Sequence, residues 1–113
     1  MSTILVCCLC AEWCSSCRDY KGTFFAVGQD YPDARFLWID IEDQPEMVGD
    51  IGVEDFPTVM IANGTEPRFF GPVTPQREVL MRLVDAHWND FEGTAISDRE
   101  LWALAARLRA AAP

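Results

Sequence analysis

The chain has 113 residues, which fits one compact domain and leaves too few residues for two independent cores. Half of the residues are apolar or aromatic and 24% are charged, a composition typical of a folded globular protein. The formal net charge of −9 argues against nucleic acid and anionic membranes as partners, because both are bound through Lys and Arg. No segment is apolar for long enough to cross a bilayer and no export signal is visible, so we expect a cytoplasmic protein.

The first half of the chain alternates between strand and helix patterns. Residues 3–10 form a continuous run rich in Ile, Val and Cys, which predicts a strand buried on both faces. A helix should follow and end before Pro32, because apolar residues recur at three and four positions. Residues 35–41 predict a second buried strand, and residues 45–51 a short helix closed by Gly52. The apolar side of the long helix would carry Cys17, Tyr20, Phe24, Val27 and Tyr31.

The second half begins with a predicted hairpin. Residues 57–62 and 68–71 have strand patterns on either side of Asn63-Gly64, a strong turn signal. Apolar spacing over residues 79–91 then predicts a third helix, and a capping box at Ser97 and Glu100 predicts a last helix over 98–112. The order β-α-β-α-β-β-α-α predicts an α/β fold with a mixed sheet and helices on both of its faces.

All five cysteines lie in the first seventeen residues, around the junction of the first strand and the first helix. In a reducing compartment they are expected to be catalytic, metal-binding or buried thiols rather than structural disulfides, and their odd number prevents complete pairing. They are Cys7, Cys8, Cys10, Cys14 and Cys17.

The motif Cys14-Ser15-Ser16-Cys17 is the strongest candidate for chemistry. Cys14 falls at the predicted helix start, where unpaired N–H groups and the positive end of the helix dipole stabilise a thiolate. Cys17 lies one turn further on, on the apolar side. We therefore expect Cys14 to attack a partner disulfide and Cys17 to resolve the mixed disulfide, with the two sulfurs cycling between dithiol and disulfide. A structural zinc half-site or two core cysteines are the alternatives for this spacing.

Two separated segments resemble the thioredoxin family. Ala11-Glu12-Trp13-Cys14-Ser15-Ser16-Cys17 is similar to its strand-to-helix motif, and Phe56-Pro57-Thr58 resembles its cis-proline loop. Gly71 matches a glycine near the same surface. The resemblance implies a cis Pro57 and a substrate surface made of Trp13, Asp55, Phe56, Pro57 and Gly71. It also implies disulfide-containing protein substrates, a thioredoxin reductase or another thiol donor, and no cofactor or metal.

The chain departs from the family in three places. Only two residues precede the first strand, so we expect a thioredoxin-like fold trimmed to four strands, with residues 1–93 as the domain and 94–113 as an extra C-terminal helix packed on it. Cys8 and Trp38 stand where the family's proton-relay aspartate and lysine align. Ser15-Ser16 replaces the usual glycine and proline, so the redox potential and the direction of electron flow stay open.

We therefore predict a monomeric thiol-disulfide oxidoreductase that contributes to cell redox homeostasis. Two other classes remain open. The chain could be a thioredoxin-fold binding module without turnover, or a metal or iron–sulfur protein that uses the spacing Cys8-x-Cys10-x3-Cys14-x2-Cys17. Burial behind the motif disfavours the metal, because Cys8 and Cys10 would share one face of a core strand.

Overall fold

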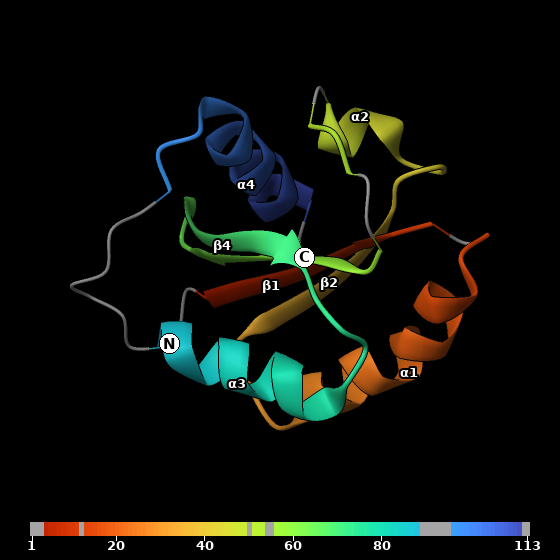
Figure 1. Ribbon diagram of the computed structural model, residues 1–113. Coiled ribbons are helices and arrows are strands. Elements are labelled where there is room, and N and C mark those ends of the chain that lie inside the picture. Colours follow the sequence, from red (N-terminus) through yellow and green to blue (C-terminus); the bar gives the residue numbers. More distant parts are fainter. Residues whose placement is uncertain (1–3, 12, 50, 54–55, 89–95, 112–113) are drawn as a thin grey trace.

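The structure, a computed structural model, describes residues 4–11, 13–49, 51–53, 56–88 and 96–111. Within these residues a four-stranded sheet of order β2-β1-β3-β4 lies between two layers of helices (Figure 1). The predicted order of elements and the mixed sheet are confirmed. The elements are β1 (Ile4–Cys10), α1 (Ser15–Gln29), β2 (Arg35–Asp40), α2 (Pro45–Val48), β3 (Thr58–Asn63), β4 (Glu66–Pro72), α3 (Arg77–Trp88) and α4 (Arg99–Ala111).

Strand β1 is the centre of the molecule. It pairs in parallel with β2 and antiparallel with β3, and every one of its seven residues is buried. Because side chains alternate along a strand, its two faces enter two separate hydrophobic cores. Ile4, Val6, Cys8 and Cys10 belong to the core under α1 and α3, and Leu5, Cys7 and Leu9 to the core under α2 and α4. The predicted double-sided burial is confirmed.

Helices α1 and α3 cover the first of these faces (Figure 1). The residues that α1 buries are Cys17, Tyr20, Phe24 and Val27, at the three- and four-residue spacing that predicted the helix. Helix α3 adds Leu80 and Val84 to the same core. Four of the five cysteines contact this core, and Cys7 belongs to the other one.

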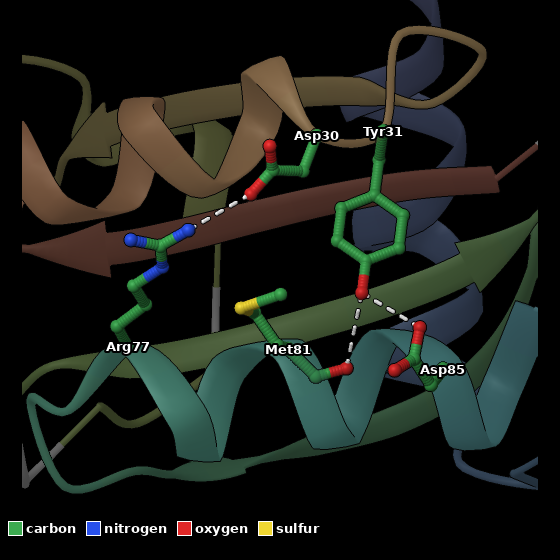
Figure 2. Close-up of polar contacts among 5 residues, drawn as sticks. All are labelled: Asp30, Tyr31, Arg77, Met81 and Asp85. Atoms are coloured by element: carbon green, nitrogen blue, oxygen red, sulfur yellow. Dashed lines mark hydrogen bonds and ion pairs between the residues drawn. The ribbon is translucent and has the colours of Figure 1, made fainter.

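Polar contacts fasten the end of α1 to α3 (Figure 2). The Tyr31 hydroxyl donates a hydrogen bond to Asp85 Oδ1 at 2.6 Å and lies 3.4 Å from the Met81 carbonyl oxygen. One turn of α3 away, Arg77 Nη2 forms an ion pair with Asp30 Oδ2 at 3.1 Å. Both side chains of that pair are half-exposed, so it contributes little, whereas Tyr31 is half-buried and supplies the stronger tie.

Replacing Tyr31 by Phe is expected to lower the free energy of unfolding by about 1 kcal/mol near neutral pH. Burial, the hydrogen bond to Asp85 and the nearby carboxylates raise the pKa of Tyr31 to about 12 from an ordinary 10.0. The folded state thus holds this proton more tightly than the unfolded chain. Its stabilising effect is complete below about pH 10 and is lost as the pH rises through about 12. Denaturation of both proteins across that range should show the difference shrinking; a constant difference would contradict the assignment.

The opposite face of the sheet is covered by α2 and α4. Helix α4 buries Leu101, Leu104, Ala105 and Leu108 against the sheet. Two arginines in the last turns of α4 hold it to α2 and to the turn between β3 and β4. Arg107 Nε donates to the Met47 carbonyl oxygen at 2.7 Å, and Arg109 Nη2 donates to the Gly64 carbonyl oxygen at 2.9 Å. The extra helix is therefore an integral layer of the fold.

Several boundaries differ from the prediction, among them the end of α2, the start of α4 and the start of β4. Helix α2 ends at Val48, because Gly49 takes a left-handed φ of 61° there and Gly52 is not needed as the stop. At the start of α4 it is Asp98, not Ser97, that accepts a hydrogen bond from a helix N–H, that of Glu100 at 2.8 Å. Strand β4 begins earlier, at Glu66. Within the described part of the chain, no helix combines the length and apolarity needed to cross a membrane.

Candidate redox site

Four cysteine sulfurs gather where β1 ends and α1 begins. Cys8, Cys10 and Cys17 are members of the core under α1 and α3, and Cys14 packs against that core from its edge. The chain turns over only a few residues between Cys10 and α1, and the Cys14 N–H donates to the Ala11 carbonyl oxygen at 3.0 Å. This tight turn brings the strand end and the helix start together.

The pairing of these sulfurs is not the predicted one. Cys17 forms a disulfide with Cys10, with the two Cα atoms 5.8 Å apart, a normal separation for such a bond. Cys14 is a free thiol. The physical reason is that Cys10 points from the end of β1 toward α1, while Cys17 points back from the first turn of α1 into the same core. Both residues of the bond are only 1% exposed.

Cys14 occupies the cap position of α1 and is half-buried. Its carbonyl oxygen accepts the Arg18 N–H at 3.2 Å, and its side chain makes no capping hydrogen bond. The first turn of α1 holds no acidic residue. The thiol therefore lies at a helix start and is partly open to solvent, the position expected of an exchanging cysteine.

Cys7 and Cys8 are fully buried thiols on opposite faces of β1. Burial raises the pKa of Cys8, and burial together with the neighbouring Cys8 raises that of Cys7. Both therefore stay protonated and inert toward solvent reagents near neutral pH. Cys8 Sγ lies 3.6 Å from Cys10 Sγ, within reach of a weak S–H hydrogen bond.

A cis-proline loop faces the cysteines. The Phe56–Pro57 peptide bond is cis, in agreement with the resemblance. The Trp13 ring meets the Phe56 ring edge to face at a centroid distance of 5.6 Å, and Phe56 packs on the same core as Cys14. Trp13 is 65% exposed, and its Nε1 donates to Glu42 Oε1 at 3.1 Å. An exposed aromatic surface thus lies beside the free thiol.

The end of β4 lies against this loop. The Val73 N–H donates to the Pro57 carbonyl oxygen at 3.0 Å, and Gly71 pairs with Val59 two residues beyond Pro57. A Cβ at Gly71 would meet the Phe69 ring at 3.6 Å, an ordinary contact, so space alone does not require glycine here. Trp13, Phe56, Pro57 and Gly71 therefore border one region, while Asp55 lies outside the described residues.

Trp38 and Cys17 both line a cleft next to the redox site. The cleft has a volume of about 300 Å³ between α1 and β2. Lys21 Nζ lies 5.8 Å from the centroid of the Trp38 ring, so one wall of the cleft combines a cation with an aromatic ring. The lining includes Cys17, Trp38, Arg18, Lys21, Asp40 and Asp43.

The metal alternative gains no geometric support from the residues described. Two of its four candidate sulfurs are consumed in the Cys10–Cys17 bond. Among the described side chains, no group of three or more His, Cys, Asp or Glu is arranged to hold a metal ion.

Sequence reasoning missed Cys10 as a partner of Cys17. The signal was present, because Cys10 ends a predicted strand and shares its face with Cys8, which was placed behind the motif. Cys17 was placed on the apolar side of the helix that covers that face. Cys10 at the end of the strand and Cys14 at the start of the helix are therefore both possible disulfide partners of Cys17.

The structure places a disulfide and a free thiol side by side where the central strand of a mixed four-stranded sheet meets α1. The family model of thioredoxin matches residues 1–85. The chain therefore belongs to the thioredoxin family, and a disulfide beside a free thiol at the strand-to-helix junction agrees with the thiol-disulfide chemistry of that family.

Sequence relatives are partial matches. A putative thioredoxin 2 of Streptomyces coelicolor is 35% identical over 51 residues, which cover 45% of this chain and 38% of that protein. Thioredoxin H5 of Oryza sativa subsp. japonica is 32% identical over 56 residues, covering 50% of this chain and 42% of the relative. The chain thus spans less than half the length of these two relatives.

Solved structures extend the similarity across more of the fold. Thioredoxin NaTrxh of Nicotiana alata superposes with a TM-score of 0.69 at 20% identity, over 79% of this chain and 76% of the other. The germline-specific thioredoxin Deadhead of Drosophila melanogaster gives 0.68 at 18% identity, over 76% and 82%. At such identities the likeness establishes the fold.

Proposed function

We propose that this protein is a thiol-disulfide oxidoreductase that reduces protein disulfides through Cys14. The observation that carries the proposal is a half-buried free thiol at the start of α1, next to a disulfide that involves the buried Cys17. Thiols exchange with disulfides only as thiolates, and a helix start is where a thiolate is best stabilised. Cys14 is thus the attacking residue.

Cys17 is the proposed resolving residue. In the reduced protein the Cys14 thiolate attacks a substrate disulfide, one substrate sulfur leaves as a thiol, and a mixed disulfide joins Cys14 to the substrate. The Cys17 thiolate then attacks Cys14 Sγ and releases the second substrate sulfur. The position of Cys17 in the first turn of α1, facing the core, supports this order because only Cys14 is accessible to a protein.

The surface around Trp13, Phe56 and Pro57 is the proposed substrate site. An extended substrate segment can lie against the cis-proline loop, while Trp13 offers a flat apolar contact. Asp55 and Gly71 are included from the resemblance. The proposed substrates are disulfide-containing proteins, and the proposed electron donor is a thioredoxin reductase or another thiol. We also propose that the protein acts as a cytoplasmic monomer.

Reduction of insulin tests the function. The wild-type protein is added to insulin with dithiothreitol, or with thioredoxin reductase and NADPH, and precipitation of the reduced insulin chains is followed. We expect the protein to accelerate precipitation in proportion to its concentration. A rate equal to that of the reductant alone would reject catalysis and leave the non-catalytic binding module as the better interpretation.

Replacement of Trp13 by Ala is expected to raise the KM for insulin about tenfold, the equivalent of about 1.4 kcal/mol, because a flat apolar contact is lost. The kcat should stay within about twofold, since Trp13 contacts no reacting sulfur in the proposed mechanism. Steady-state kinetics over a range of insulin concentrations give both constants. Phe25, another exposed aromatic residue, lies on α1 and provides the control as Phe25→Ala, for which KM should be unchanged. An unaltered KM in Trp13→Ala would remove Trp13 from the substrate site.

A further inference from the structure

We propose that Cys10 is a third redox-active cysteine, which competes with Cys14 for a disulfide bond to Cys17. The proposal rests on the function proposed above, because it takes Cys14 as the thiol that exchanges with substrates. Cys17 is bonded to Cys10 while Cys14, three residues before Cys17 at the helix cap, is a free thiol. One sulfur thus has two cysteine partners within reach.

The local geometry allows either bond. A cap residue and the third residue of a helix are neighbours on its first turn, which is the relation of Cys14 to Cys17. Cys10 reaches Cys17 from the opposite direction, from the end of β1, with a Cα–Cα separation of 5.8 Å. All three residues contact one core, so exchange between them needs no change of fold.

The exchange is a balanced intramolecular step. The Cys14 thiolate attacks Cys17 Sγ, the Cys14–Cys17 bond forms, the Cys10–Cys17 bond breaks, and Cys10 leaves as a thiolate that takes up a proton. The proton that Cys14 lost goes to solvent. One disulfide and one thiol are present before and after, so no external oxidant or reductant is consumed.

Cys8 favours the departure of Cys10. Its sulfur lies 3.6 Å from Cys10 Sγ, and burial raises the pKa of Cys8, so at neutral pH it remains a thiol that can donate a hydrogen bond to the departing sulfur. Buried negative charge is costly unless a donor meets it. In the position where the resemblance places an acidic relay residue, this chain thus has a neutral donor.

The two oxidised forms differ in what a partner protein meets. With Cys14 bonded to Cys17, the disulfide includes a half-buried sulfur that an external thiol can attack. With Cys10 bonded to Cys17, both bonded residues are 1% exposed, and Cys14 is a surface thiol whose resolving partner is occupied. External reductants then reach the buried bond only through Cys14.

Disulfide mapping tests whether Cys10 is the disulfide partner of Cys17 in the oxidised protein. The purified protein is oxidised with diamide, quenched in acid, labelled with N-ethylmaleimide in denaturant and digested with trypsin and a Glu-specific protease. Cleavage after Glu12 separates Cys10 from Cys14. We expect a two-chain peptide linked through Cys17, with label on Cys14. Cys10→Ala should lose this peptide and give a looped peptide closed between Cys14 and Cys17, whereas Cys7→Ala and Cys8→Ala should retain it.

The rate of reduction tests the exchange. Oxidised Cys14→Ser retains the Cys10–Cys17 bond but lacks the attacking thiol, so dithiothreitol should open that bond at least about tenfold more slowly than in the wild type. Equal rates, or an oxidised wild type with only the looped peptide, would overturn the proposal. If only the looped peptide with a Cys14–Cys17 bond is found and insulin is still reduced, the role of Cys10 is wrong but the proposed function stands. If the peptide linked through Cys10 and Cys17 is found but insulin is not reduced, the proposed function is wrong.

Discussion

Replacement of Cys14 by serine is expected to bring insulin reduction down to the rate of the reductant alone, a loss of at least about 100-fold. A serine hydroxyl stays protonated at neutral pH and does not exchange with disulfides, so the variant lacks the proposed attacking group. Among the described cysteines, Cys14 is the one that is not fully buried. Turbidity or fluorescent-substrate assays measure the rate.

A matched control separates this chemical loss from damage to the fold. Cys7→Ala removes a thiol from the opposite face of β1, in the core under α2 and α4, and should keep the insulin rate within about twofold. Cys17→Ser should leave substrate attached to Cys14 as a mixed disulfide, visible on non-reducing gels. Activity that persists in Cys14→Ser would contradict the assignment of the attacking residue.

Truncation of Leu104 to Ala is expected to lower the free energy of unfolding by about 3 kcal/mol. Leu104 is fully buried in the core under α4, and the change removes its contacts and leaves a cavity. For a domain with a typical stability of about 5–15 kcal/mol, this is a large fraction of the total. Denaturation in urea, with the midpoint and slope compared with the wild type, measures the loss.

Ala106 supplies the comparison on the same helix. It faces solvent, so Ala106→Ser should cost no more than about 0.5 kcal/mol through helix propensity alone. Because Cys14 and Cys17, the cysteines proposed to react, contact the core on the other face of the sheet, folded Leu104→Ala should reduce insulin at the wild-type rate. A loss below about 1 kcal/mol would mean that α4 is not an integral layer of the fold.

The fold was predictable because the patterns were local and strong. The continuous apolar run of β1 indicated a strand buried on both sides, and the spacing from Cys17 to Val27 indicated the face of α1. The predictions that failed concern the burial of β2, which is an edge strand with one buried residue in six, and the ends of elements. There the choice between Gly49 and Gly52, or between Ser97 and Asp98, depends on backbone conformation that composition does not fix.

The disulfide pairing was harder to predict than the fold. Spacing placed Cys14 and Cys17 on one turn of a helix, and this favoured them as partners. Whether Cys10 competes depends on how tightly the chain turns after Ala11 and on where the last side chain of β1 points. Both depend on the tertiary structure and cannot be read from the spacing of the cysteines. The cis-proline loop was anticipated through the resemblance, since proline alone is usually trans.

The alternation of β1 places two adjacent thiols in two different layers of the molecule. A reagent reaches Cys7 only when α2 and α4 separate from the sheet, and it reaches Cys8 only when α1 and α3 do. The labelling rates of Cys7 and Cys8 therefore report separately on the opening of the two layers. If the two thiols are labelled at the same rate, the protein unfolds as one cooperative unit. If one thiol is labelled faster, the helices that cover it separate from the sheet first.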